Sequence, residues 1–148
     1  MPRTITLQTP HRQRGTSMLE VLVAFIILAV GLLGLAGLQA NALKNNQSSL
    51  QRSQAIMLSY SILDAIRADR ANANSYAMSA TCSVPSGSSL VKSTQNIWIA
   101  NLKTALGNNA STCGSIACNA GTCTITITWD DSRGGGSSTE TLVTEGRI

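Results

Sequence analysis

The chain has 148 residues, with 11 Lys and Arg against 7 Asp and Glu, a formal net charge of +4. Three of the basic residues lie in the first fifteen positions, so residues 16–148 carry eight basic and seven acidic side chains, 8 − 7 = +1. This balance excludes nucleic acid as the expected partner, because nucleic-acid binding needs a basic patch or stripe.

A basic leader opens the chain, MPRTITLQTPHRQRG, and it contains no apolar stretch. Its positive charge places this end in the cytoplasm. An apolar run from Gly15 to Leu38 follows, with Glu20 as its single charged residue. A secretory signal peptide is cut after its apolar segment, whereas the cut site expected here, between Gly15 and Thr16, precedes the run. The apolar segment therefore stays on the mature protein.

Glu20 is the unusual residue of this segment. A carboxylate inside a membrane-length helix costs several kcal/mol on insertion scales and marks a functional site. Cleavage before Thr16 creates an α-amino group that the Glu20 carboxylate of an adjacent copy can neutralise, which predicts assembly. The competing interpretation is a plain signal anchor, in which Glu20 snorkels to the membrane interface.

The stretch QRGTSMLEVLVA, residues 13–24, resembles the class III leader junction of type IV pilins and the related pseudopilins. The resemblance implies cleavage by a prepilin peptidase after Gly15, N-methylation of Thr16, and a register-setting role in subunit assembly for Glu20. Most members have Phe where this chain has Thr16, a departure that concerns methylation more than cleavage. The following stretch ILAVGLLGLAGLQ, residues 27–39, is similar to the PilV family of minor pilins, the type IV pilus modification proteins.

The family resemblance implies an α+β type IV pilin lollipop, with a long N-terminal helix packed on a small antiparallel β-sheet head. Its parts are a removed leader (1–15), a helix (16–70) that spans the membrane to about residue 38, and a disulfide-tied head (71–148). The implied location is the bacterial inner membrane with the head in the periplasm, and then the tip or base of a pilus. The implied partners are prepilin peptidase, other minor pilins, the major pilin, the inner-membrane assembly platform and a tip adhesin.

Three functions fit this resemblance. The favoured one is a minor pilin that primes or caps a type IV pilus. The nearest alternative is a minor pseudopilin of a type II secretion system, and the third is a pilin-anchored adhesin or binding head. Only the glycine-rich loop Gly134–Ser138 would serve the third function.

The helix is expected to continue to about Asp69, because no proline occurs between Pro10 and Pro85. It carries two apolar faces beyond Leu38. Packing against the head explains the first face, and a partner subunit is expected on the second. The first comprises Leu43, Leu50, Ile56, Met57, Tyr60 and Leu63, and the second Leu58, Ile62 and Ile66. Gly31, Gly34 and Gly37 fit either close helix pairing or local flexibility, and flexibility is favoured.

In the head, residues 71–91 are predicted to form a loop. An amphipathic helix follows, with Trp98 in the core and a stop at Gly107. Its candidate caps are Ser93, Thr94 and Asn96, and its apolar face comprises Trp98, Ile99, Leu102, Ala105 and Leu106. Alternation predicts a strand over Thr122–Asp130. A mobile turn containing Gly134–Gly136 joins it to a second antiparallel strand near Thr139–Thr144.

Four cysteines lie on the exported side of the chain: Cys82, Cys113, Cys118 and Cys123. Disulfides are expected there. Four cysteines allow three pairings, of which Cys118 with Cys123 and Cys82 with Cys113 is preferred. A zinc site is the competing interpretation, but the gaps beside Cys118 differ from the two-residue spacing of zinc ribbons.

Catalysis and cofactors are not expected. The single histidine, His11, lies in the leader, and its removal takes away any His-dependent base, nucleophile or metal ligand. Asp130 and Asp131 are adjacent, which fits a turn better than an acid–base pair. The chain is instead expected to be a substrate of a peptidase and a methyltransferase.

Overall fold

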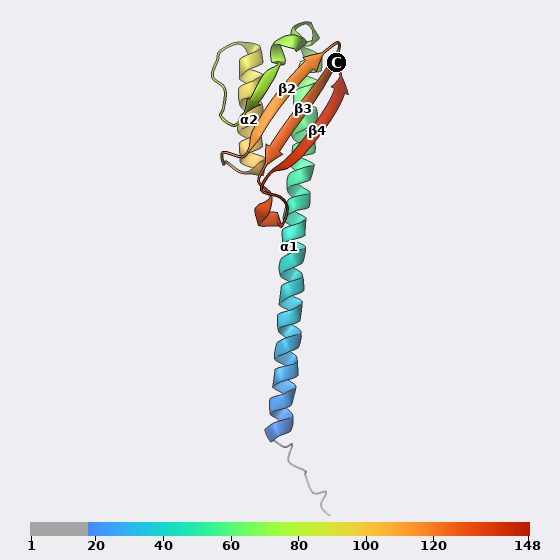
Figure 1. The fold of residues 1–148 in the computed structure, drawn as a ribbon, viewed down its shortest axis with the longest axis vertical. Helices are drawn as coiled ribbons and strands as arrows, with labels where there is room; N and C mark the ends of the chain where they lie inside the picture. Colours follow the sequence, from blue (N-terminus) through green and yellow to red (C-terminus); the bar gives the residue numbers. More distant parts are fainter. Residues whose placement is uncertain (1–17) are drawn as a thin grey trace, which may run out of the picture. The chain divides into compact units, whose positions relative to one another are not determined.

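A computed structural model describes residues 18–148 of the chain. It divides into two compact units, one running through Gln39 and the other Ala40–Ile148. Helix α1, Met18–Ala68, contributes to both (Figure 1). Its 51 residues lie within a segment free of proline, so nothing interrupts the backbone hydrogen bonds of the helix.

The first unit is the N-terminal part of α1. All of its described residues, 18–39, are exposed to solvent. By length and composition, α1 is the one helix among the described residues that could cross a membrane.

The second unit is built on a four-stranded antiparallel sheet in the order β1-β2-β3-β4. The strands are β1 (Met78–Thr81), β2 (Cys113–Asn119), β3 (Thr122–Trp129) and β4 (Glu140–Arg147). A two-residue turn, Ala120 and Gly121, joins β2 to β3 with positive φ at both positions, as tight hairpins require. The predicted strands β3 and β4 and their hairpin are confirmed.

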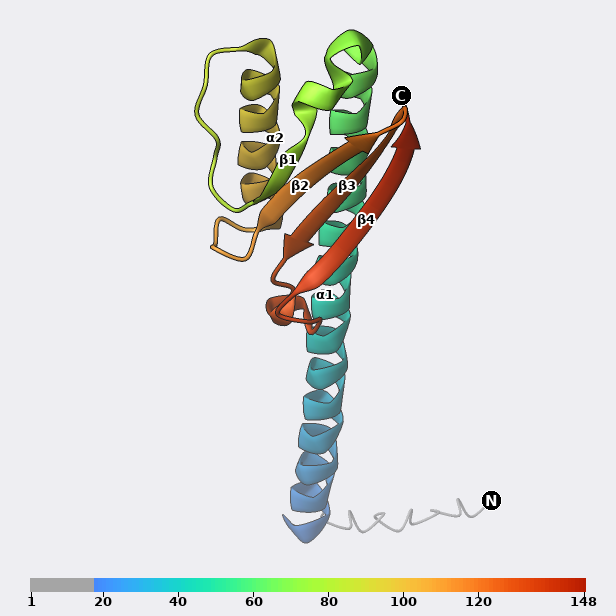
Figure 2. The same cartoon turned by 45° about the horizontal axis from the view of Figure 1, so that its top comes forward.

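Helices α1 and α2 (Leu90–Leu106) lie side by side on one face of the sheet (Figures 1 and 2). The core lies between these two layers. It includes the predicted apolar face of α2, with Trp98 only 3% exposed, and the alternating residues Cys123, Ile125, Ile127 and Trp129 of β3. The indole N–H of Trp98 donates to the Leu58 carbonyl of α1 at 3.0 Å, which joins the two helices.

Several details differ from the sequence predictions. Residues 71–91 are not all loop, because the 3-10 helix η1 (Arg70–Tyr76) and strand β1 lie within them. Strand β2 was not predicted. The N-cap of α2 is Ser89, whose hydroxyl accepts from the Lys92 amide, so all three proposed caps are wrong. The helix stops before Gly107 as predicted.

Part of the glycine-rich turn after β3 packs against α1, and the mobility of the rest of the turn stays a prediction. It contains the short 3-10 helix η2 (Ser132–Gly134), and Gly134 is buried. A Cβ on Gly134 would lie 3.0 Å from Ser48 Cβ of α1. Asp131 is 1% exposed and accepts a 2.5 Å hydrogen bond from the Ser48 hydroxyl, which fixes the turn to the helix.

Candidate assembly site

The predicted cleavage and methylation positions, Gly15 and Thr16, lie outside the described residues, as does His11. Glu20 is described, and it lies in the first turn of α1 with an exposed side chain. No ion pair within residues 18–148 involves Glu20. A carboxylate in the first turn is favoured by the positive end of the helix dipole, so the helix tolerates this charge at the start of an apolar surface.

The helix surface around Glu20 is apolar on all sides. Large side chains from Met18 to Leu38 are between 44% and 93% exposed, and none is covered by another part of the described chain. Full burial of one large apolar side chain is worth about 1.5 to 3 kcal/mol. A surface of this size is therefore stable only in a membrane or against other apolar helices.

The three glycines of this segment face open space. A Cβ added at Gly31, Gly34 or Gly37 would meet no atom within 4 Å. Both interpretations of the glycines, close pairing with another helix and local flexibility, fit this finding.

The two apolar faces of α1 in the second unit are used in the opposite way to that predicted. The face expected to pack on the head is largely solvent-exposed, since Leu43, Leu50 and Met57 are 70%, 58% and 62% exposed. Leu63 is the exception on that face, with 0% exposure. The face assigned to a partner packs on the head instead. It is built from Ala55, Ser59, Ile62, Leu63 and Ile66, with Leu58 partly buried beside it.

The reason for this reversal is the size of the side chains on the buried face. Ala55 and Ser59 are fully buried, and their small side chains let the sheet approach the helix closely. Ser59 also accepts a 2.9 Å hydrogen bond from the Thr144 hydroxyl of β4. The sheet therefore covers the side with small residues, and the seven-residue stripe of Leu43, Leu50 and Met57 is left exposed.

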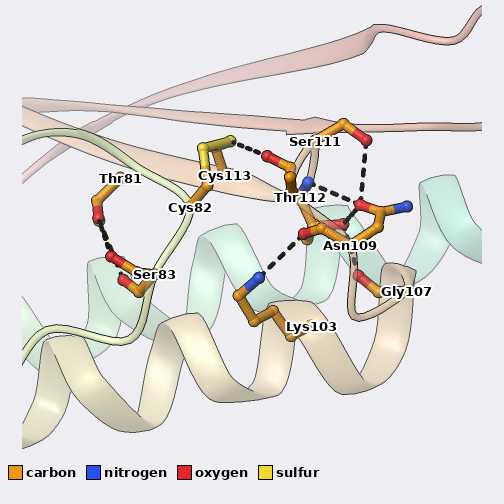
Figure 3. Close-up of a disulfide and its surroundings, with 10 residues drawn as sticks. Thr81, Cys82, Ser83, Lys103, Gly107, Asn109, Ser111, Thr112 and Cys113 are labelled. Carbon is orange, nitrogen blue, oxygen red and sulfur yellow. Dashed lines mark hydrogen bonds between the residues drawn. A yellow bond between two sulfur atoms is a disulfide. The ribbon is translucent and has the colours of Figure 1, made fainter.

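Two disulfides staple neighbouring strands of the sheet. Cys82 is bonded to Cys113, joining the end of β1 to the start of β2, and Cys118 to Cys123, joining β2 to β3. This is the pairing preferred from the sequence. Figure 3 shows the first bond beside the loop that precedes β2. The second bond joins residues that are directly opposite in the hairpin register.

The charged residues near the end of α1 lie on its solvated surface. Arg67 pairs with Asp64 at 2.6 Å on the exposed surface, and its Nε donates to the Arg147 carbonyl of β4. Among the described residues, no group of three or more His, Cys, Asp or Glu could hold a metal ion. With the cysteines in disulfides, the zinc interpretation loses its ligands.

Residues 10–36 match the family model described as the prokaryotic N-terminal methylation motif. This range includes Gly15, Thr16 and Glu20. Neither the curated proteins nor the solved structures provide a match.

The motif and the architecture together identify the class of protein. A long N-terminal apolar helix packed on a four-stranded antiparallel sheet, with the methylation motif at its start, fits the type IV pilin fold. The chain is type IV pilin-like, and its motif indicates a pilin or pseudopilin that is a substrate of prepilin peptidase and assembles with other pilins. Proteins of this kind are structural subunits, and the chain is not an enzyme. It is anchored in a membrane before it joins its fibre.

Proposed function

We propose that the chain is a PilV-like minor pilin that assembles with other pilins to prime or cap a type IV pilus. The observation that carries this proposal is the uncovered apolar surface of α1 from Met18 to Leu38, with Glu20 as its single charge. The inner membrane covers this surface while the head is in the periplasm. In the fibre, the helices of other subunits replace the lipid.

Glu20 sets the position of the neighbouring subunit in this proposal. After cleavage at Gly15, the methylated amino group of Thr16 is the only cation near the apolar layer. Thr16 precedes Glu20 by four residues in the sequence, and four residues of an ideal α-helix would span about 6 Å along its axis. A neighbouring helix displaced by this distance brings its Thr16 amine beside the Glu20 carboxylate. Other displacements leave both charges unpaired in apolar surroundings, at a cost of several kcal/mol.

The exposed stripe of Leu43, Leu50 and Met57 is a second apolar helix surface, in the second unit, that a neighbouring subunit can cover. It recurs every seven residues, which is the spacing of a helix-to-helix seam. The face of α1 that packs on the sheet is separate from this stripe, so the head and a neighbouring subunit can be bound at the same time.

A minor pseudopilin of a type II secretion system is the alternative, because it uses the same cleavage, carboxylate and apolar helix. Two features support the pilus: the similarity of residues 27–39 to PilV minor pilins and a head with two disulfides. The partners proposed on this basis are the other minor pilins, the major pilin, the assembly platform and a tip adhesin.

Deletion of the gene tests the choice between these fibres. The measurement compares major pilin in the sheared surface fraction with that in whole cells. A loss of surface pilin with an unchanged cellular pool supports the minor pilin. Unchanged surface pilin together with a loss of protein secretion contradicts it and establishes the pseudopilin.

The Glu20→Ala variant tests the assembly role of the carboxylate. We expect normal cleavage but about tenfold less of the variant in the surface fraction, because the neighbouring amine loses its partner. Glu145→Ala is the matched control, since Glu145 is an exposed acidic residue of β4. Equal incorporation of both variants would remove Glu20 from the assembly site.

A further inference from the structure

A polar cavity of about 430 Å³ lies in the second unit. It is formed where the C-terminal end of α2 and the loop after it meet α1 and the turn after β3. Volumes of about 300 to 1,000 Å³ are typical of sites for small ligands. The apolar side chains of the proposed assembly surface are not among the residues that line this cavity.

The side chains around the cavity are rich in hydrogen-bonding groups. They include four carboxamides, one carboxylate and one guanidinium, from Gln47, Gln51, Asn108, Asn109, Asp130 and Arg133. A carboxamide has two donor hydrogens and one acceptor oxygen, and one of these groups is already engaged, since the Gln51 side-chain nitrogen donates to the Leu106 carbonyl at 3.5 Å. The carboxylate and the guanidinium cancel in charge, so the lining is neutral overall. No aromatic side chain is among the lining residues.

The loop on the α2 side of the cavity is held in place by its own hydrogen bonds (Figure 3). The Asn109 side-chain oxygen accepts from the Thr112 amide at 3.0 Å and from the Thr112 hydroxyl at 2.9 Å. Lys103 Nζ donates to the Asn109 carbonyl at 3.0 Å. The adjacent Cys113 is fixed by its disulfide to Cys82. Asn109 is therefore positioned through its oxygen, and its amide nitrogen remains available as a donor.

The turn on the opposite side of the cavity is also fixed. The Asp130 carboxylate accepts from the Ser132 amide at 2.9 Å. Hydrogen bonds from Ser132, with the nearby Arg133 guanidinium, hold the pKa of Asp130 below its ordinary value, so it is ionised at neutral pH. Asp131 ties the same turn to Ser48 of α1. The loop and the turn are thus both held by contacts within the chain before any ligand arrives, which reduces the entropic cost of binding.

We propose that this cavity binds a neutral saccharide of one or two sugar units. Sugar hydroxyls both donate and accept hydrogen bonds, and carboxamides, a carboxylate and a guanidinium present both kinds of partner. A neutral lining disfavours a strongly charged ligand. A peptide would leave its side chains without apolar pockets, because the lining is mainly polar. The proposal does not depend on the kind of fibre in which the subunit is placed.

The test uses the full chain in dodecylphosphocholine micelles, which carry no sugar headgroup, and follows its side-chain carboxamide signals by NMR. The probes are glucose, galactose, mannose, N-acetylglucosamine, N-acetylgalactosamine and lactose, each raised to about 50 mM so that millimolar affinity is detected. We expect at least one of them to shift the carboxamide signals of the cavity.

Variants separate the cavity from the rest of the surface. Asn108→Ala and Gln47→Ala should each weaken binding about tenfold, by loss of one or two hydrogen bonds. Gln47 is an exposed helical residue, so its replacement by alanine preserves the fold. Asn119→Ala is the control, because Asn119 is an exposed amide at the end of β2, outside the lining. Its affinity should stay within about twofold of the parent.

Three outcomes would overturn the proposal. The first is the absence of a shift with every sugar. The second is a shift that both cavity variants leave unchanged. The third is a response to glycylglycine and to none of the sugars, which would identify a peptide site instead.

Discussion

Removing each disulfide separately should destabilise the head by different amounts. Cys82–Cys113 closes a sequence separation of 31 residues, and Cys118–Cys123 one of 5 residues. The loop-entropy relation gives about 3.7 kcal/mol for the first bond and about 2.1 kcal/mol for the second at 25 °C. Cys82→Ala/Cys113→Ala should therefore cost about 1.6 kcal/mol more than Cys118→Ala/Cys123→Ala.

The structure supports the same order. Cys118 and Cys123 are opposite each other across a tight hairpin, with seven consecutive residue pairs in register between β2 and β3. By contrast, β1 has only two paired positions with β2. The bond from Cys82 to Cys113 therefore fixes the shortest strand of the sheet, whose register with β2 shifts between Met78 and Thr81.

Urea unfolding of the full chain in micelles measures both values, with tryptophan fluorescence as the signal. Trp98 and Trp129 are both buried in the head, so their emission reports its unfolding. If the two double variants lose equal free energy of unfolding, or if Cys118→Ala/Cys123→Ala loses more, the loop-entropy argument is refuted.

Three further predictions concern processing, packing and pH. Gly15→Val should leave an uncleaved precursor, heavier than the mature chain by its leader, on an immunoblot; a mature band of normal size would show that the cut lies elsewhere. Gly114→Ala should destabilise the head by about 1 to 3 kcal/mol in the same urea assay, because its Cβ would lie 2.6 Å from the Trp98 ring. Unchanged stability would mean that the ring can move aside. Burial, opposed by a hydrogen bond with Thr94, raises the pKa of Tyr76. Stability should therefore be constant below the ordinary tyrosine pKa of about 10 and fall above it, as the unfolded chain loses its proton first. Tyr76→Phe should flatten this alkaline decline and Tyr60→Phe, at a half-exposed position, should not; equal effects would contradict the argument.

The sequence predicted secondary structure best where the hydrophobic periodicity and the residues that end helices and strands agreed. The alternation from Thr122 to Trp129 identified β3 because its buried residues are large and its outer residues are threonines. Gly107 marked the end of α2. Strand β2, with the sequence CGSIACN, contains one β-branched residue in seven. Its pairing with β3 and its two cysteines, rather than its own propensity, make it a strand.

The assembly surface shows a second limit of sequence patterns. Both faces of α1 carry large apolar residues, so hydrophobic periodicity could not determine which one meets the sheet. The small side chains of Ala55 and Ser59 decide which face is buried, because they let the sheet come close to the helix. How closely the sheet comes depends on the fold of the whole head.

The polar cavity could not be predicted from the sequence either. Its carboxamides come from residues 47 to 109, with Asp130 and Arg133 further along the chain, and no local motif joins them. The adjacent residues Asp130 and Asp131 indicated a turn. The burial of Asp131 also depends on Gly134 and Gly136, which lie against its side chain and have no room for a Cβ. A Cβ on Gly134 would lie 2.6 Å from the Asp131 carboxylate.

The bonds between α1 and the C-terminal part of the chain have a mechanical consequence. Ser48, Arg52 and Ser59 contact Asp131, Glu140 and Thr144, so bonds at three levels of one helix reach residues more than eighty positions away. Tension along α1 is divided among these bonds instead of reaching them one after another. Slippage of the helix by a single turn, about 5.4 Å, would have to break all three together. Beyond that point the disulfides limit how far the sheet can extend. The head is therefore built to stay folded when its helix is pulled.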